Sequence, residues 1–138
     1  MSEVPPLSRA SLTPDTIAPD GSEIRLLATA YNGATRASLC EVRLPAGAVS
    51  RPITHRTVEE IWYVTSGRGR VWRCAPGQTA EPVDVEPGEA LVIPTGWRFQ
   101  FSAAPDVELR FLCYTSPPWP GPDEAEPAGL GGLGPPTR

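Results

Sequence analysis

The stretch HRTVEEIWYVTSGRG, residues 55–69, alternates in polarity along its middle part and ends in a glycine-rich turn. In an extended chain, Glu60, Trp62 and Val64 would share one face of a strand. The stretch also holds the only histidine of the sequence, His55, four and five residues before a pair of glutamates. It therefore predicts a β-strand with a carboxylate and an aromatic ring on one face, and a histidine close by.

Short β-type runs continue on both sides of this stretch, and turn signals such as YNG, PAG, APG, EPG and PTG separate them. No window of useful length shows a helical stripe. One domain of 138 residues with about eight short strands predicts an all-β fold, either a sandwich or a closed barrel. The runs are IRLLATA (24–30), ASLCEVRL (37–44), VEEIWYVT (58–65), GRVWRC (69–74), EPVDVE (81–86), ALVIP (90–94), RFQFSA (98–103) and VELRFLCYT (107–115).

The two ends of the chain differ in texture from the middle. Proline and glycine crowd residues 117–138, which indicates a segment of low foldability with a docked start at Trp119. We therefore expect an extended N-terminal arm over 1–23, a β-domain over 24–118 and a flexible Pro/Gly-rich tail over 119–138.

Charge and composition exclude several classes of function. The net charge is −4 and gives no electrostatic footprint for nucleic acid. No signal peptide and no apolar run of membrane-spanning length is visible, so we expect a cytoplasmic protein without a membrane partner. All 12 basic residues are arginine, which excludes a lysine Schiff base. The cysteines (Cys40, Cys74 and Cys113) lack a CxxC pair and are expected to be core thiols.

A second aromatic face is predicted in WRFQFSA, residues 97–103, where Trp97, Phe99 and Phe101 would lie opposite Arg98 and Gln100. Two strands with aromatic faces suit an apolar lumen that takes a small molecule. The alternative is that these rings simply fill the core, as aromatic side chains often do.

The spacing of glycines and polar residues resembles the cupins, a family of small jelly-roll barrels. Their first motif, G-x5-H-x-H-x3-4-E-x6-G, aligns with Gly47 to Gly67, and their second, G-x5-P-x-G-x2-H-x3-N, with Gly88 to Ala103. The wider pattern HRTVEEIWYVTSGRGRVWR … IPTGWRFQF … PPWPG is similar to single-domain bacterial cupins often labelled after mannose-6-phosphate isomerase. The resemblance implies an all-β cupin jelly-roll β-barrel.

The resemblance also implies four metal-ligand positions, which fall on Ile53, His55, Glu60 and Phe99. Only His55 and Glu60 keep a ligating side chain, whereas a transition-metal site needs at least three protein ligands. A third ligand could come from an inward Gln100, Cys113 or aspartate, although alternation turns Gln100 away from Phe99. We therefore expect no cofactor, and His55 and Glu60 as the ligands if a divalent metal is held.

The remaining polar pair suggests the chemistry. His55 and Glu60 would act as acid and base in isomerisation, cyclisation, dehydration or elimination of a small organic molecule. The same pair could instead be retained for packing. In the first reading, the expected substrate-binding residues are Trp62, Trp97, Phe99, Phe101 and, as a clamp for an anionic group, Arg51.

Two other functions remain open at this stage, a non-catalytic small-molecule binding module and a metal-dependent isomerase or dioxygenase. Fold alone does not separate these. A homodimer is also expected, since jelly-roll edges need covering and the arm could pair with a second subunit.

Overall fold

The computed structural model describes residues 4–138; residues 1–3 of the predicted arm lie outside the described residues. The described chain is almost entirely β-structure with two short 3-10 helices. The elements are β1 (Thr16–Ile17), β2 (Glu23–Ala28), η1 (Ala30–Asn32), β3 (Ser38–Leu44), β4 (Ile53–His55), β5 (Glu59–Ser66), β6 (Gly69–Cys74), β7 (Val83–Val85), β8 (Ala90–Ile93), β9 (Arg98–Ala103), β10 (Leu109–Ser116), η2 (Pro122–Glu124) and β11 (Ala125–Pro127).

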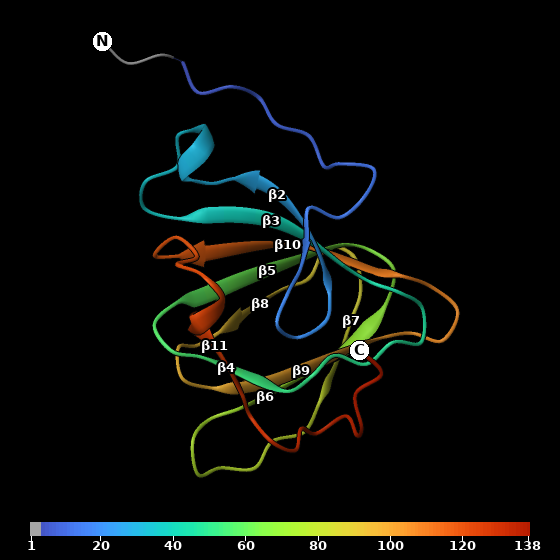
Figure 1. Ribbon diagram of the computed structural model, residues 1–138. Coiled ribbons are helices and arrows are strands. Elements are labelled where there is room, and N and C mark those ends of the chain that lie inside the picture. The colour runs from blue at the N-terminus through green and yellow to red at the C-terminus, as the bar shows by residue number, and fades with distance from the viewer. Residues whose placement is uncertain (1–3) are drawn as a thin grey trace.

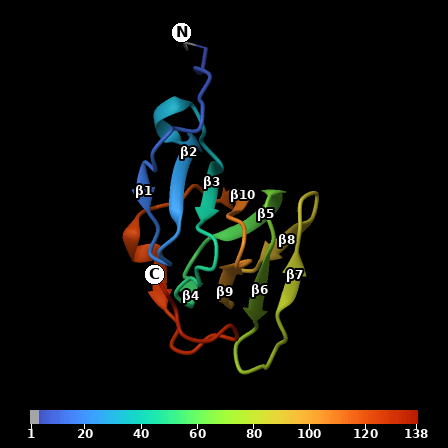
Figure 2. The ribbon, with the colours of Figure 1, turned by 90° about the vertical axis from the view of Figure 1, so that its right-hand side faces the viewer.

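The strands form two antiparallel sheets that face each other (Figures 1 and 2). One sheet has the order β1-β2-β3-β10-β5-β8, and the other has the order β11-β4-β9-β6-β7. Strands that are neighbours in space are often distant in sequence, as in the pairing of β10 with both β3 and β5. This confirms the predicted all-β jelly roll, with its strands arranged as two sheets.

All eight predicted β-type runs are strands in the structure. The sequence did not predict β1, β4 and β11, which are two or three residues long. None of the three lies in a β-type run that the sequence marks, so only their partners in the fold reveal them; β7, also three residues long, lies within the predicted run 81–86. Of the three, β4 matters most for function because it carries His55.

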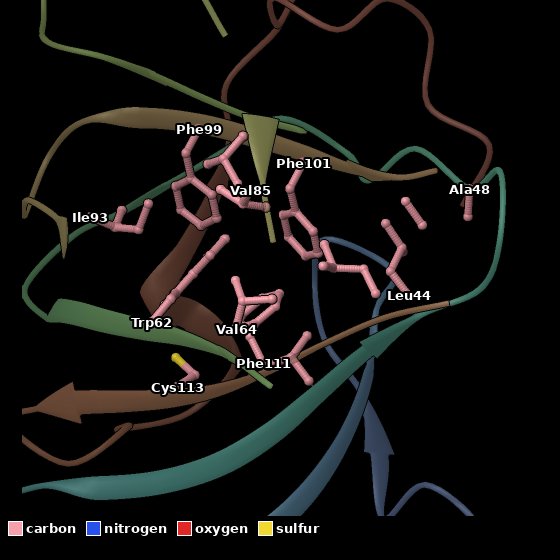
Figure 3. Packing of buried hydrophobic residues seen from close by; sticks show 14 of the residues in the cluster. Leu44, Ala48, Trp62, Val64, Val85, Ile93, Phe99, Phe101, Phe111 and Cys113 are labelled. Carbon is pink, nitrogen blue, oxygen red and sulfur yellow. The ribbon is translucent and has the colours of Figure 1, made fainter. Parts of the chain in front are cut away.

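Alternation assigned the faces of the central strands correctly. Along β5, the exposed fractions of Ile61 and Tyr63 are 41% and 47%, whereas Trp62 is 2% exposed. Phe99 and Phe101 on β9 are likewise buried. Figure 3 shows these inward side chains meeting between the two sheets, where they form one apolar core.

The C-terminal segment differs from the flexible tail that the sequence predicts. Residues 117–138, here called the strap, run along the five-stranded sheet and appear in red in Figure 1. β11 pairs with β4, and the side chain of Gln100 bonds to backbone groups of Leu133 and Gly134. Gly132 approaches the Trp72 ring so closely that a Cβ atom would lie 2.2 Å from it. The glycines that suggested low foldability thus allow close packing against the sheet.

The N-terminal arm also lies against its own domain. β1 pairs with β2, and Arg25 donates hydrogen bonds to the backbone oxygens of Ser11 and Leu12. In this chain the arm therefore covers the β2 edge of the six-stranded sheet.

Within the described residues, no helix is long and apolar enough to span a membrane.

Candidate functional site

The predicted acid–base pair comes together between the two sheets. His55 ends β4 of the five-stranded sheet, and Glu60 lies on β5 of the six-stranded sheet. The distance from His55 Nδ1 to Glu60 Oε2 is 4.0 Å, and both side chains are buried. A turn of only three residues separates the strands, so the sequence places the two groups on facing sheets with little chain between them.

Two hydrogen bonds fix the carboxylate of Glu60. The indole Nε1 of Trp62 donates to Oε1 at 3.0 Å, and the hydroxyl of Thr115 donates to Oε2 at 3.1 Å. Thr115 lies directly opposite Glu60 on the neighbouring strand β10. Each oxygen therefore has one donor, and Oε2 keeps an open side toward His55.

The imidazole of His55 is held by rings. Phe99 lies on one side with a centroid distance of 4.9 Å, and Trp119 of the strap lies at 5.2 Å, both in edge-on geometry. Nδ1 is buried and has no hydrogen-bond partner in the described part of the chain. An unpartnered buried nitrogen carries a desolvation cost, which a ligand or water at this position would remove.

Two further buried carboxylates contribute to the field around His55. Burial raises the pKa of Asp20, and the negative charge of Glu60 adds to this effect, while hydrogen bonds from Ser22 and the nearby His55 oppose it. Asp20 precedes β2, and its backbone oxygen accepts a bond from the amide of Arg51. The N-terminal part of the chain thus supplies an acid that is more readily protonated than an ordinary aspartate.

Glu124 belongs to the strap and locks it onto the domain. Its carboxylate accepts hydrogen bonds from the backbone amides of Thr57 and Val58 and from the Thr57 hydroxyl. Burial alone would raise the pKa of Glu124, but these bonds outweigh it and lower the pKa below the ordinary value, with a smaller contribution from His55. The anchor is therefore ionised at neutral pH.

The strap closes the site from outside. Ala125 of β11 pairs with His55, and Trp119 covers the imidazole edge-on. Access to His55 therefore requires movement of Trp119 or of the neighbouring strap. Beside this point lies a surface cleft of about 340 Å³, lined by Arg56, Thr57 and residues 120–124.

The aromatic side chains fill the interior and leave it closed. Trp62 stacks on Phe111 at 4.2 Å and meets Phe99 and Phe101 edge-on, so the rings pack on one another (Figure 3). All four are at most 2% exposed. The rings therefore pack as core residues, which was the alternative that the sequence left open. They leave no open aromatic-walled space between the sheets in this structure.

Two predicted substrate-binding residues, Trp97 and Arg51, lie outside the strands. Trp97 lies in the turn before β9 and is partly exposed; its amide donates to Pro94 O, and the amide of the preceding Gly96 donates to His55 O. Arg51 is exposed, and its guanidinium donates to the backbone oxygen of Pro19. The guanidinium of Arg51 is thus bonded to Pro19 and not to the His55–Glu60 pair, and the assignment of Trp97 and Arg51 as substrate-binding residues stays a prediction.

The family's four metal-ligand positions converge in space but do not fit a metal. Ile53 and Phe99 are paired across β4 and β9, and both are buried apolar residues beside His55. The described residues contain no group of three or more histidine, cysteine or acidic side chains placed to hold a metal ion. Both carboxylate oxygens of Glu60 already accept a hydrogen bond, one from the Trp62 indole and the other from the Thr115 hydroxyl. The donor set is thus too small and already engaged.

Sequence reasoning missed Thr115, Asp20 and Glu124. Thr115 could have been inferred, because it shares the inward face of β10 with Phe111 and Cys113. Asp20 and Glu124 reach the site through long-range packing, and no local pattern marks them. The outward-facing Trp72 on β6 is a further signal, beside the expected docking of Trp119, that another segment covers the five-stranded sheet.

Comparison with known proteins identifies the family. The family model described as the cupin domain matches residues 40–115, which run from within β3 to near the end of β10 and contain both residues of the His55–Glu60 pair. The chain belongs to the cupin family. The chain is also 32% identical over 105 residues to the uncharacterised protein MJ1618 of Methanocaldococcus jannaschii; the match covers 75% of this chain and 79% of that one.

Solved cupin structures share the fold. A variant of oxalate decarboxylase from B. subtilis superimposes with a TM-score of 0.74 at 16% identity, over 93% of this chain and 34% of that one. The chain thus spans about a third of that enzyme. The polyketide cyclase RemF from Streptomyces resistomycificus gives a TM-score of 0.64 at 24% identity, over 94% and 85% of the two chains. Identities this low establish the architecture alone.

Proposed function

We propose that this cupin binds a small organic molecule at the His55–Glu60 pair and transfers a proton to or from it without a metal. The observation that carries the proposal is the pair itself. Glu60 is oriented by Trp62 and Thr115, while the buried Nδ1 of the only histidine has no hydrogen-bond partner within residues 4–138. General acid–base catalysis needs a titratable group held within reach of the proton that it moves.

The roles follow from the surroundings of each group. His55 acts as the base or acid because imidazole is the side chain that most often transfers protons in enzymes. Glu60 stabilises the imidazolium that forms, since Oε2 lies 4.0 Å from Nδ1. Trp62 and Thr115 keep the carboxylate in place, so little reorganisation is needed when charge develops.

The reaction classes that fit are isomerisation, cyclisation, dehydration and elimination, all of which move a proton between carbon or oxygen atoms. The same fold in a protein named as a polyketide cyclase supports keeping cyclisation among them. Metal chemistry has no support from the residues, because Ile53 and Phe99 stand at two of the four ligand positions. We propose that the substrate reaches the pair from the cleft beside Arg56 when Trp119 moves aside.

A non-catalytic binding cupin is the second candidate, and the filled interior favours it. Four tightly packed rings leave room for a ligand only after side chains move. In that case His55 and Glu60 would orient a ligand without transferring a proton.

The two candidates are distinguished by a proton-exchange assay that needs no knowledge of the product. Pools of small carbonyl compounds and hydroxy acids are incubated with the protein in D₂O, and deuterium at carbon is followed by NMR or mass spectrometry. We expect uptake in at least one compound class, and a loss of about 10²-fold or more in His55→Ala and in Glu60→Gln. The matched control is Arg70→Gln, an exposed residue on β6 that should leave the rate unchanged.

Compounds that bind without any exchange would support the non-catalytic candidate. Exchange that persists in His55→Ala would contradict the assignment of the base. Thermal unfolding of each variant shows whether a loss of exchange reflects a loss of fold.

A further inference from the structure

Two cysteines from different strands face each other beneath the site. Cys40 on β3 and Cys113 on β10 are direct partners in the antiparallel register. Both lie on the inner face of the sheet, where Cys113 is part of the core and Cys40 packs against it. The neighbouring thiol of Cys40 contributes to the raised pKa of Cys113. In the described chain Cys74 lies in the other sheet, with Gln78 O and Arg98 beside its sulfur.

The spacing of this pair suits a disulfide. Directly opposed residues of antiparallel strands have Cα atoms about 4.5–5.5 Å apart, inside the range of about 4.4–6.8 Å found across disulfides. The bond can therefore form with small adjustments of two neighbouring strands.

The pair is connected to the carboxylate of the site. Cys113 Sγ lies 3.6 Å from Thr115 Oγ1, and the same hydroxyl donates to Glu60 Oε2 at 3.1 Å. A disulfide would remove the thiol hydrogen of Cys113 and draw its sulfur toward β3. The contact with Thr115 would then change, and with it the environment of Glu60.

We propose that Cys40 and Cys113 form a reversible redox site that a hydroperoxide converts into a cross-strand disulfide. Formation of the disulfide changes the hydrogen bond from the Thr115 hydroxyl to the Glu60 carboxylate. This inference stands independently of the proposed proton-transfer function, because it rests on the register of β3 and β10.

The chemistry balances in two steps. The thiolate of Cys40, the less buried of the two, attacks the outer oxygen of the hydroperoxide. The O–O bond breaks, an alcohol or water leaves with the thiol proton, and Cys40 becomes a sulfenic acid. Cys113 then attacks that sulfur, the S–O bond breaks, and water leaves with the second thiol proton. The two thiols together lose two electrons, and the hydroperoxide gains them.

Burial makes Cys113 the second cysteine to react. Burial raises its pKa well above the ordinary thiol value, and the neighbouring Cys40 adds to the shift, so Cys113 remains protonated and resists direct oxidation. It reacts once Cys40 presents an electrophilic sulfur beside it.

The sequence makes the test direct, because trypsin places the three cysteines in three different peptides. Cleavage after arginine gives 37–43 with Cys40, 74–98 with Cys74 and 111–138 with Cys113. The full-length protein is treated with hydrogen peroxide, its remaining thiols are alkylated under denaturing conditions, and it is digested without reductant. We expect a monomer lighter by two hydrogen atoms, peptide 37–43 joined to 111–138, and alkylation at Cys74 alone. Reduction should restore three alkylated thiols.

Cys74→Ser is the matched control and should form the same cross-link, whereas Cys40→Ser and Cys113→Ser should not. Peptide mapping of the unaltered protein already shows whether the cross-link forms, even if a serine variant fails to fold. The proposal is overturned by any of three results: three free thiols after peroxide treatment, Cys40 oxidised beyond the sulfenic state without a cross-link, or a disulfide that contains Cys74. In the NMR spectrum, oxidation should shift the indole signal of Trp62, which shares the Glu60 carboxylate; an unchanged signal in the cross-linked protein would overturn the connection to the site.

Discussion

Removing the anchor of the strap should expose the only histidine. Glu124→Ala deletes the acceptor for the amides of Thr57 and Val58 and for the Thr57 hydroxyl. Hydrogen bonds to a charged group contribute about 1.5–3 kcal/mol each. If each of the two amide bonds contributes the lower value, the free energy that favours the closed strap over the open one falls by about 3 kcal/mol. Since about 1.4 kcal/mol corresponds to a factor of ten, the open population should rise roughly 100-fold.

The assay is acylation of His55 by diethyl pyrocarbonate at mildly alkaline pH, read by mass spectrometry. The chain has one histidine, so imidazole acylation reports on a single site. When reclosing is fast, the rate follows the open population. We expect slow reaction in the unaltered protein and an increase of up to roughly 100-fold in Glu124→Ala.

The control for charge is Glu126→Gln, which removes an exposed carboxylate from β11 that pairs with Arg56 at 3.3 Å. An exposed ion pair contributes about 0–1 kcal/mol, so this rate should change by less than about fivefold. The control for global unfolding is thiol labelling of Cys113, which belongs to the apolar core between the sheets and should stay slow in every variant. If Glu124→Ala is acylated at the rate of the unaltered protein, or if His55 already reacts there like free imidazole, the strap does not close the site.

Four further predictions follow from the same contacts. Phe99→Ala should lower the free energy of unfolding in urea by about 3–5 kcal/mol, because a buried ring against His55 is lost; a change under about 1 kcal/mol would contradict its place in the core. The double change Ile53→His with Phe99→His should create measurable zinc affinity by calorimetry, and no gain would indicate that these positions do not match the family's ligands. The stability advantage of Glu124 over Glu124→Gln should be present at neutral pH and disappear as the pH falls through the lowered pKa of this carboxyl, which denaturation at several pH values measures. The homodimer stays a prediction, and a monomer mass in light scattering at micromolar concentration would contradict it.

The sequence predicted the central strands well because their physics is local. Alternation in β5 and β9 follows from one sheet face being buried, so Trp62 and Phe99 could be oriented without knowledge of the fold. The resemblance to cupins added the convergence of His55 and Glu60, which spacing alone left open. Local patterns therefore predicted the frame of the site, and motif positions predicted its main pair.

What the sequence did not show depends on long-range packing. The strap is rich in proline and glycine, and its order comes from contacts with Gln100, Trp72 and Thr57 rather than from its own propensity. Arg51 was assigned to the site from its proximity in sequence, but side-chain direction in a loop has no periodicity to fix it. Whether aromatic rings line a space or fill it depends on how they pack across two sheets, which no single strand encodes.

The central claim, that the His55–Glu60 pair is where this cupin meets its ligand, is tested most directly by NMR of a ligand-bound sample. A compound is first selected by thermal shift from small organic acids and carbonyl compounds, and the imidazole of His55 and the four indole signals are then followed during its titration. The account predicts that the signals of His55 and Trp62 shift together, while Trp72, whose indole bonds to Ala80 O, does not move. It also predicts that Glu60→Gln weakens binding at least about tenfold, as expected for a lost bond to a charged group. Saturable binding that leaves His55 and Trp62 unshifted, or that Glu60→Gln does not weaken, would contradict the claim.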